Sequence, residues 1–213
     1  SVLSESTRTR AQKLSDPKQD DASKKSQYVI VLDAGHGGKD EGAVSDDGKL
    51  EEKEYNLAVV KEIARLLEQS GVKVYCTRTT DRTVSKKARV RLANKRQADM
   101  LVSVHCNASD ARKHFVRGIE VLYSKRDNGA GYTNKQLAAK LLKKTVAATG
   151  LPARGVIRRE DLYLMHHAKV PAVIVETGYL TNPSDCLYMR QEKGIRQTAW
   201  GIYQAVMETL EKY

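Results

Sequence analysis

Long apolar runs are missing from this sequence of 213 residues. A helix needs about 18 to 20 consecutive apolar residues to cross a bilayer, so we expect no transmembrane segment in the chain. The first residues, Ser1 to Glu5, also lack the basic and then apolar pattern of an export signal. We therefore expect any signal or anchor to lie outside the given sequence.

Cysteine is scarce as well. The three cysteines, Cys76, Cys106 and Cys186, show no CxxC spacing and cannot all pair with one another. This count excludes a disulfide scaffold and a zinc site made of thiolates. We expect three free thiols, with one disulfide as the alternative.

Aromatic residues are few, with one Phe and one Trp, while basic residues outnumber acidic ones by 37 to 26 and give a formal net charge of +11. Such a balance favours a polyanionic partner through counterion release and steering. The alternative is that these charges only form solvated helix faces. Because few rings are available to stack on bases, we expect no specific nucleic-acid partner.

The chain divides into two parts. Residues 1–27 are rich in Ser, Lys, Asp and Gln without apolar periodicity, which predicts a disordered tail or linker. Residues 28–213 are long enough for one domain. Strand-like and helix-like segments alternate along it, which predicts an α/β fold: a single three-layer domain with a mostly parallel, twisted sheet flanked by helices.

The expected elements follow from hydrophobic period and from the glycine stops. We expect strands at 28–33, 72–76, 100–105, 118–123 and 171–176. We expect helices from Glu52 to about Gly71, and at about 86–97, 134–148 and 195–210.

Residues able to carry chemistry stand at the ends of three of these apolar strands. His36 follows the first strand within a run of glycines, and His105 and Glu176 each end a strand. Because the carboxyl ends of parallel strands share one edge of a sheet, we expect the three side chains to converge there.

The alternation along residues 101–106 places Leu101, Ser103 and His105 on one face and Cys106 on the other. Nitrogen and oxygen donors then remain, and two His with one carboxylate and an open fourth position form the arrangement of catalytic zinc. The spacing leaves three carboxylates as candidates, because Glu51, Glu52 and Glu54 all lie where a helix dipole alone favours acids.

Taken together, several segments resemble one family in the same order along the chain. They are Asp33-Ala-Gly-His36-Gly-Gly, Glu52-Lys53, Asn56-Leu57, Thr77-Arg78, Asp81, Arg91, Ala93-Asn94, Ala98-Asp99, Ser103-Val-His105-Cys-Asn107-Ala108, Arg117-Gly118 and Pro171 through Glu176 to Asn182. The chain from Tyr28 to Leu210 is similar in these positions to the zinc-dependent N-acetylmuramoyl-L-alanine amidases of bacterial cell-wall turnover.

The resemblance implies one Zn²⁺ per chain, with His36, Glu52 and His105 as ligands and Glu176 as the catalytic residue. It implies hydrolysis of the amide between the lactyl group of N-acetylmuramic acid and L-alanine of the stem peptide, by zinc-activated water with a glutamate general base. Peptidoglycan or muropeptide is then the substrate, and the location is extracytoplasmic. An anionic wall polymer and a regulatory protein remain candidate partners.

Further residues receive weaker assignments. Asn107, His166 and His167 are candidates for substrate binding. Arg78 and Arg91 are expected to be buried ion-pair partners of aspartates. The segment 108–175 leaves no stretch for an extra helix that covers the zinc, so we expect an open site.

Two other functions compete with this interpretation. A zinc carboxypeptidase would use the same kind of residues but needs an arginine for the terminal carboxylate, and a binding module without catalysis would hold no metal.

Overall fold

The computed structural model describes residues 28–110, 114–126 and 128–213. The segment 1–27, expected to be a tail or linker, lies outside the described residues. Within the described ranges the strands form one six-stranded sheet in the order β2-β1-β3-β6-β4-β5. The strands are β1 (Val29–Ala34), β2 (Lys73–Cys76), β3 (Met100–Asn107), β4 (Ile119–Tyr123), β5 (Ala153–Arg158) and β6 (Ala172–Tyr179). The helices are α2 (Glu52–Gln69), α3 (Lys86–Arg96), α4 (Asn134–Thr149), α5 (Tyr163–His167), α6 (Pro183–Met189) and α7 (Glu192–Lys212).

The sheet is mostly parallel, as expected. Strands β2, β1, β3 and β6 run in the same direction. Strand β4 runs against β6, and β5 is parallel to β4. One edge of the sheet therefore collects the carboxyl ends of β1, β3 and β6 together with the amino ends of β4 and β5.

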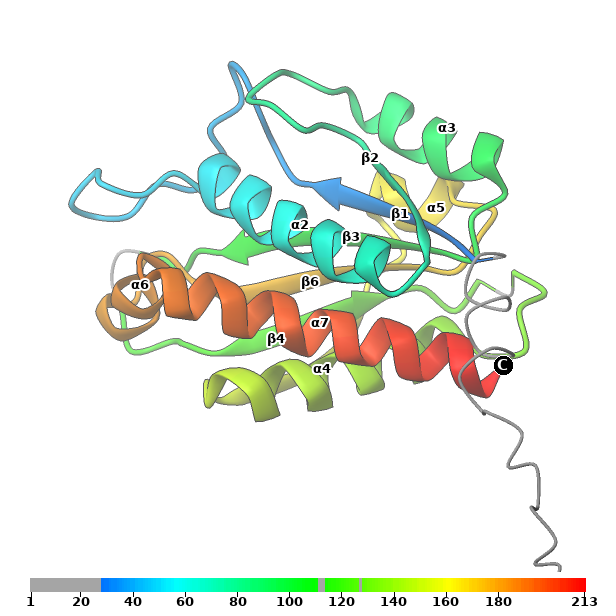
Figure 1. The fold of residues 1–213 in the computed structure, drawn as a ribbon. Helices are drawn as coiled ribbons and strands as arrows, with labels where there is room; N and C mark the ends of the chain where they lie inside the picture. The colour runs from blue at the N-terminus through cyan, green and yellow to red at the C-terminus, as the bar shows by residue number, and fades with distance from the viewer. Residues whose placement is uncertain (1–27, 111–113, 127) are drawn as a thin grey trace, which may run out of the picture.

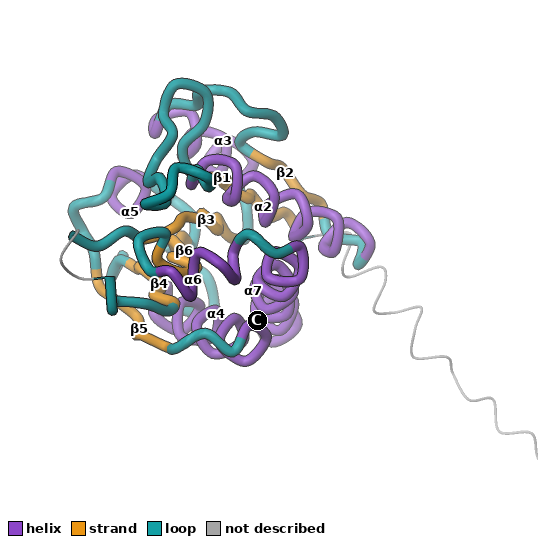
Figure 2. The backbone as a smooth tube through the Cα atoms, turned by 90° about the vertical axis from the view of Figure 1, so that its left-hand side faces the viewer, coloured by secondary structure: helices purple, strands orange, loops and turns teal. Residues whose placement is uncertain are grey.

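The two faces of the sheet are covered unequally. Helices α2, α4 and α7 lie side by side over one face, while α3 and the short α5 lie on the other (Figures 1 and 2). The larger buried cluster fills the space under α2, α4 and α7, and a smaller one, which includes Val31, Leu101 and Leu164, lies under α3 and α5. The face that bears α3 and α5 is covered by fewer and shorter helices, so it has room for a cleft.

Three described elements were not expected from the sequence: β5, α5 and α6. Strand β5 lies at the edge of the sheet and four of its six residues are exposed, so it shows no apolar alternation. Helices α5 and α6 are five and seven residues long, too short for a helical period to appear.

The cysteines are all free, as expected, and lie in the described part of the chain. Among the described residues, no helix is both long and apolar enough to cross a membrane.

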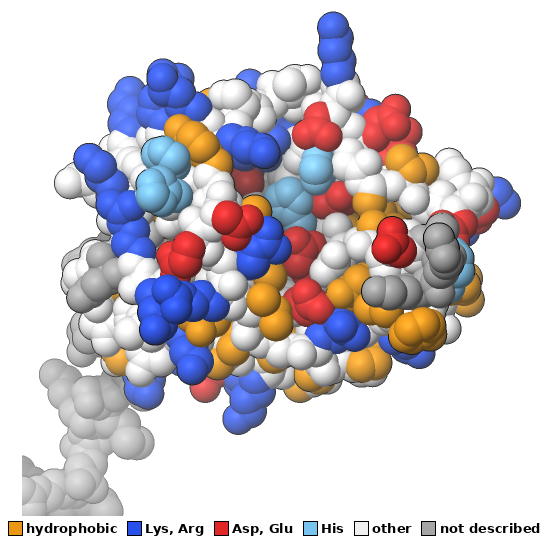
Figure 3. All heavy atoms as spheres, turned by 180° about the vertical axis from the view of Figure 1, so that it is seen from behind, with side chains coloured by type: hydrophobic (Ala, Val, Ile, Leu, Met, Phe, Trp, Pro, Cys, Tyr) orange, Lys and Arg blue, Asp and Glu red, His pale blue; other side chains and the backbone are white. Residues whose placement is uncertain are grey.

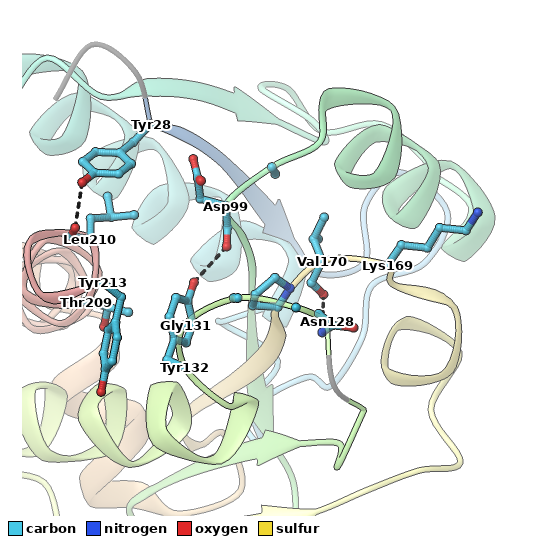
Figure 4. A pocket seen from close by; sticks show the side chains of 14 residues that line it. Tyr28, Asp99, Asn128, Gly131, Tyr132, Lys169, Val170, Thr209, Leu210 and Tyr213 are labelled. Atoms are coloured by element: carbon cyan, nitrogen blue, oxygen red, sulfur yellow. Dashed lines mark hydrogen bonds between the residues drawn. The ribbon is translucent and has the colours of Figure 1, made fainter. Parts of the chain in front are cut away.

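The edge opposite the carboxyl ends of β1, β3 and β6 contains a hollow of about 260 Å³ (Figure 4). Its tyrosines are tied to the backbone, since the Tyr28 hydroxyl donates to Leu210 O (2.9 Å) and the Tyr132 hydroxyl donates to Asp99 O (2.8 Å). Tyr213 also lines it. The described chain thus begins and ends at this edge.

A buried ion pair between Asp33 and Arg89 lies at the carboxyl end of β1. Asp33 is 1% exposed and accepts hydrogen bonds from Thr77 Oγ1, Ser103 Oγ and Arg89 Nη1, each at 2.6 Å. Burial opposes ionisation, but Arg89 and the two hydroxyls outweigh it and lower the pKa of Asp33. The carboxylate is therefore charged in the folded state.

Two arginines hold the backbone that follows Asp33. Arg89 also donates to the carbonyls of Ala34 (2.6 Å) and His36 (2.7 Å). Arg78 donates to the carbonyls of Ala34 (3.0 Å) and Gly35 (2.8 Å). Together they bind three consecutive carbonyls, those of residues 34–36, where the chain leaves strand β1.

This arrangement corrects one expectation. Arg91 is exposed, and the arginine that pairs with Asp33 is Arg89. Two residues along a helix turn the side chain by about 200°, so Arg91 points to solvent when Arg89 faces the sheet. Arg78 is buried, as expected, but its hydrogen bonds go to backbone carbonyls.

Helices α4 and α7 are in close contact at Gly201. A Cβ atom there would lie 2.5 Å from the Cα atom of Thr145, which no side chain tolerates. We predict that Gly201→Ala lowers the free energy of unfolding by about 1–3 kcal/mol, because the two helices must separate. Urea titration measures this. The matched control Lys193→Ala, on the exposed face of the same helix, should change little, and equal effects of both variants would contradict the packing argument.

We also predict that Asp33→Asn destabilises the domain by about 3–5 kcal/mol at pH 7, because it leaves the Arg89 charge buried without its partner. The lowered pKa means that the carboxylate stabilises the fold above pH 4 and that this contribution is lost as the pH falls through the folded pKa. The difference between wild type and variant in urea titrations should therefore shrink at pH 3. Asp47→Asn, which removes an exposed partner of Arg190, is the control and should have little effect. A pH-independent difference for Asp33→Asn would contradict this account.

Candidate metal centre and active site

Three side chains from three separate elements meet at the carboxyl edge. His36 lies in the loop after β1, Glu52 in the first turn of α2 and His105 near the end of β3. One ligand atom from each lies within 4.8 Å of the others. Glu52 Oε1 is 3.2 Å from His36 Nε2 and 2.9 Å from His105 Nδ1.

The backbone around His36 is built to present its ring. His36 has φ +58°, a left-handed conformation that is costly for a residue with a side chain. Arg89 holds its carbonyl, and Asp40 Oδ1 lies 2.8 Å from its Nδ1, which directs Nε2 toward Glu52. Gly35 is required beside it, because a Cβ atom there would overlap the His105 ring at 2.3 Å.

Glu52 is 3% exposed, and both of its carboxylate oxygens accept hydrogen bonds. Oε1 accepts from Cys106 N (3.0 Å) and Asn56 Nδ2 (3.3 Å), and Oε2 accepts from Ala43 N (2.8 Å). Burial opposes its charge, but hydrogen bonds from His105 and His36 outweigh burial and hold its pKa well below the usual range. Glu52 is therefore an anion.

The neighbouring acids behave differently. Glu51 pairs with Lys53 Nζ at 3.1 Å, and Glu54 is exposed. The structure thus places Glu52 beside the two histidines and the other two candidates away from them. Cys106 directs its thiol into the buried cluster under α2, on the opposite face from His105, as the alternation predicts.

This set of donors fits a zinc ion. It consists of two imidazoles and one carboxylate that lie close together, and neighbouring groups hold His36 and Glu52 in place through hydrogen bonds. Burial lowers the pKa of each histidine, but Glu52 outweighs it and raises both values. A cation at this point would take over the neutralisation of Glu52 that the imidazoles otherwise provide.

Glu176 lies next to this cluster. It is the register partner of His105 across β3 and β6. Its Oε2 atom is buried and has no hydrogen-bond partner among the described residues. Burial raises the pKa of Glu176 to about 7, with Glu52 and Glu120 adding to the effect and His105 opposing it. A carboxyl with a pKa near neutrality is suited to take up and release a proton.

A cavity of about 280 Å³ opens over these residues. Seen from the face that carries α3 and α5, histidine and acidic side chains gather in a hollow of the surface (Figure 3). The cavity is lined by Asp33, His36, Asp40, Val84, Lys86, Arg89, Ser103, His105, Leu162, Tyr163, Leu164, Ile174 and Glu176.

The candidates for substrate binding are separated by the fold. Asn107 shares the face of β3 with His105, and its Nδ2 donates to Glu120 Oε2 at 3.2 Å. His166 and His167 are both exposed on α5 and do not line the cavity, and the His167 ring stacks on Tyr163 at 3.9 Å between centroids.

A polar cluster that was not expected from the sequence lies beside Glu176 and consists of Glu120, Arg154 and Tyr179. Tyr179 Oη donates to Glu120 Oε1 at 2.8 Å, and Arg154 Nε donates to the same atom at 2.6 Å. Glu120 was part of an expected strand, but only the antiparallel direction of β4 brings it opposite Glu176. No sequence motif signals that direction.

Comparison with known proteins matches the chain to one family. The family model described as N-acetylmuramoyl-L-alanine amidase matches residues 30–208. The N-acetylmuramoyl-L-alanine amidase LytC of Bacillus subtilis is 35% identical over 163 residues, which cover 76% of this chain and 32% of LytC. The probable cell wall amidase LytH of Staphylococcus aureus is 36% identical over 187 residues, which cover 87% of this chain and 58% of LytH. The chain thus spans about a third of LytC and just over half of LytH.

The fold agrees with these matches. The catalytic domain of CwlV, an N-acetylmuramoyl-L-alanine amidase from Bacillus (Paenibacillus) polymyxa var. colistinus, superposes with a TM-score of 0.79 at 33% identity, covering 86% of this chain and 98% of that one. The match includes the three members of the His-Glu-His cluster and also Glu176, since all four residues lie within residues 30–208. The chain therefore belongs to the N-acetylmuramoyl-L-alanine amidase family.

Proposed function

We propose that the protein hydrolyses the amide between the lactyl group of N-acetylmuramic acid and L-alanine of the peptidoglycan stem peptide. The observation that carries this proposal is a buried carboxylate oxygen of Glu176 without a hydrogen-bond partner among the described residues, beside a His-Glu-His cluster. Family membership supports the substrate class, and the cavity at the carboxyl edge supplies the place for the reaction.

In this proposal His36, Glu52 and His105 hold one zinc ion per chain. A bound zinc ion supplies Lewis-acid polarisation of a carbonyl and lowers the pKa of water. The chain's own contribution is to fix the ligands. Asp40 orients the His36 ring, and the backbone amides of Ala43 and Cys106 orient the Glu52 carboxylate.

Glu176 moves the proton. Its carboxylate takes one proton from the attacking water while the oxygen of that water bonds to the carbonyl carbon of the lactyl group. When the C–N bond breaks, Glu176 delivers the proton to the departing amine nitrogen of L-alanine. A pKa of about 7 suits both halves of this exchange. The products are the lactyl carboxylic acid and the free amine.

The same proposal places the protein outside the cytoplasm, where peptidoglycan lies. The net charge of +11 suits an anionic wall polymer as an additional contact, through steering that salt would screen.

We predict one zinc per chain by elemental analysis and loss of hydrolysis with a strong chelator. Glu176→Gln should keep the fold and the zinc but reduce turnover about 10²-fold or more, because it removes the proton acceptor. His105→Ala should instead lose the metal. Products identified by mass spectrometry should carry a new amine on L-alanine.

These outcomes separate the roles. Loss of zinc from Glu176→Gln would make Glu176 a ligand, and activity that survives complete zinc removal would reject the metal mechanism. Release of single residues from peptide C-termini would identify a carboxypeptidase instead.

The segment between His105 and Glu176 contributes β4, α4, β5 and α5 among its described residues. The buried side chains of α5, Leu164 and Met165, belong to the cluster under α3, and Leu164 forms part of the wall of the cavity that opens over His105 and Glu176. We predict that the zinc-loaded protein hydrolyses soluble muropeptide without a protein activator, with release measured by chromatography. Complete inactivity until a partner is added would overturn the open-site proposal.

A further inference from the structure

The sheet face that carries the cluster continues past Glu176 as a row of polar side chains. His105, Glu176 and Glu120 are register partners on the consecutive strands β3, β6 and β4. Partners at the same register point to the same face. The row leads away from the metal ligands toward β5, at the edge of the sheet.

A bulge extends the row by one strand. In the pairing of β4 with β5, Ile119 faces Ala153 and Glu120 faces Gly155, so Arg154 is the extra residue. Gly155 has φ +131°, which a residue with a side chain rarely adopts. Bulges are rare between parallel strands, and they often occur beside active sites, where they redirect a side chain. Here the bulge brings Arg154 to Glu120.

Glu120 holds the guanidinium of Arg154 in a defined orientation. The Arg154 Nε atom lies 2.6 Å from Glu120 Oε1, and its guanidinium carbon is 5.4 Å from the centre of the Tyr179 ring. Asn107 and Tyr179 also donate to Glu120, whose side chain is 15% exposed. The Arg154 side chain is 38% exposed.

This geometry leaves Arg154 suited to a second anion. Glu120 engages the Nε atom, and a guanidinium offers further N–H donors at its two terminal nitrogens. Its plane matches a carboxylate, and more than a third of the side chain is exposed to a ligand. An exposed ion pair adds little to the stability of a fold. Stabilisation of the sheet edge therefore does not explain why three side chains, those of Arg154, Asn107 and Tyr179, donate to Glu120.

We propose that Arg154 binds a carboxylate of the stem peptide, on the side of the scissile amide that leaves as the amine. This rests on the proposed function. The guanidinium of Arg154 lies against Glu120 on β4, two strand spacings or about 10 Å from β3, and a peptide spans about 3.5 Å per residue. Arg154 therefore reaches a group two to three residues from the scissile amide, which fits the free α-carboxylate of the second residue, D-glutamate, that is linked through its side chain.

The same separation indicates that Arg154 is not the arginine with which a carboxypeptidase would bind the terminal carboxylate of its substrate. That residue must bind a carboxylate on the amino acid adjacent to the scissile bond, next to the metal. Arg154 instead lies on β5, beyond β6 and β4 from the His105 strand.

The test compares two synthetic substrates, N-acetylmuramoyl-L-Ala-γ-D-Glu-L-Lys and the same compound with the D-Glu α-carboxylate replaced by a carboxamide. The zinc-loaded full chain should prefer the carboxylate about 10-fold in kcat/KM, mainly through KM. Arg154→Ala should abolish the preference while hydrolysis of the carboxamide stays near the wild-type rate. Arg154→Lys should retain part of the preference, because it keeps the charge.

Arg158→Ala is the matched control. Arg158 is also on β5 and pairs with Glu160, but it lies opposite Tyr123, at the other end of the strand from Arg154. It should keep the wild-type preference. A structural loss in Arg154→Ala would lower the rate on both substrates and the melting temperature together. Equal preference in wild type and Arg154→Ala, or no preference in wild type, overturns the proposal.

A binding measurement separates this inference from the proposed reaction. The dipeptide L-Ala-γ-D-Glu should bind the zinc-loaded wild type about 10-fold more tightly than Arg154→Ala in titration calorimetry. Equal affinities overturn the role of Arg154 even if both substrates are cleaved. If neither substrate is cleaved, the proposed function fails, while the calorimetry still decides whether Arg154 binds the carboxylate.

Discussion

The rest of the site depends on the contacts that the buried carboxylate of Glu52 makes with its neighbours. A buried charge costs several kcal/mol unless it is paired and hydrogen-bonded. Here the loop after β1 supplies His36 and the amide of Ala43, while β3 supplies His105 and the amide of Cys106. Helix α2 carries the carboxylate itself. One anion therefore ties three elements that are far apart in the sequence into one position.

The cost of this arrangement appears in the backbone beside it. His36 is held in a left-handed conformation, and a strained residue persists only when its surroundings over-determine it. Arg89 and Arg78 provide that constraint by binding the carbonyls of residues 34–36. Arg89 is in turn fixed by Asp33. Charges that do not take part in chemistry thus set the direction of a side chain that does.

Much of this could be predicted from the sequence. The apolar strands ending in His36, His105 and Glu176 point to one edge because parallel strands share a polarity, and the alternation on β3 separates His105 from Cys106. The carboxylate between the histidines could not be chosen by spacing, since Glu51, Glu52 and Glu54 share one helical turn and only the three-dimensional path of the loop selects among them.

The polar cluster of Glu120, Arg154 and Tyr179 could not be predicted from the sequence, for a different reason. Glu120 belongs to a strand that the pattern predicts, but a period of two is the same for parallel and antiparallel strands. Arg154 depends on a bulge in an exposed edge strand without apolar alternation. Arg91 was expected to be a buried ion-pair partner of an aspartate, but Arg89 has this role, because only the rotation of α3 distinguishes the two arginines.

The hydrogen bond between Tyr28 and the carbonyl of Leu210 has a consequence for how the domain meets its substrate. Both ends of the described chain lie at the edge opposite the metal ligands (Figure 1). A tether joined at either end would leave the domain at the edge opposite the metal ligands. The edge that carries the cavity would then remain free to contact an extended polymer. The length of a tether would then set the distance that the domain can reach. The orientation of the domain on the polymer would depend only on the contacts made at the cavity.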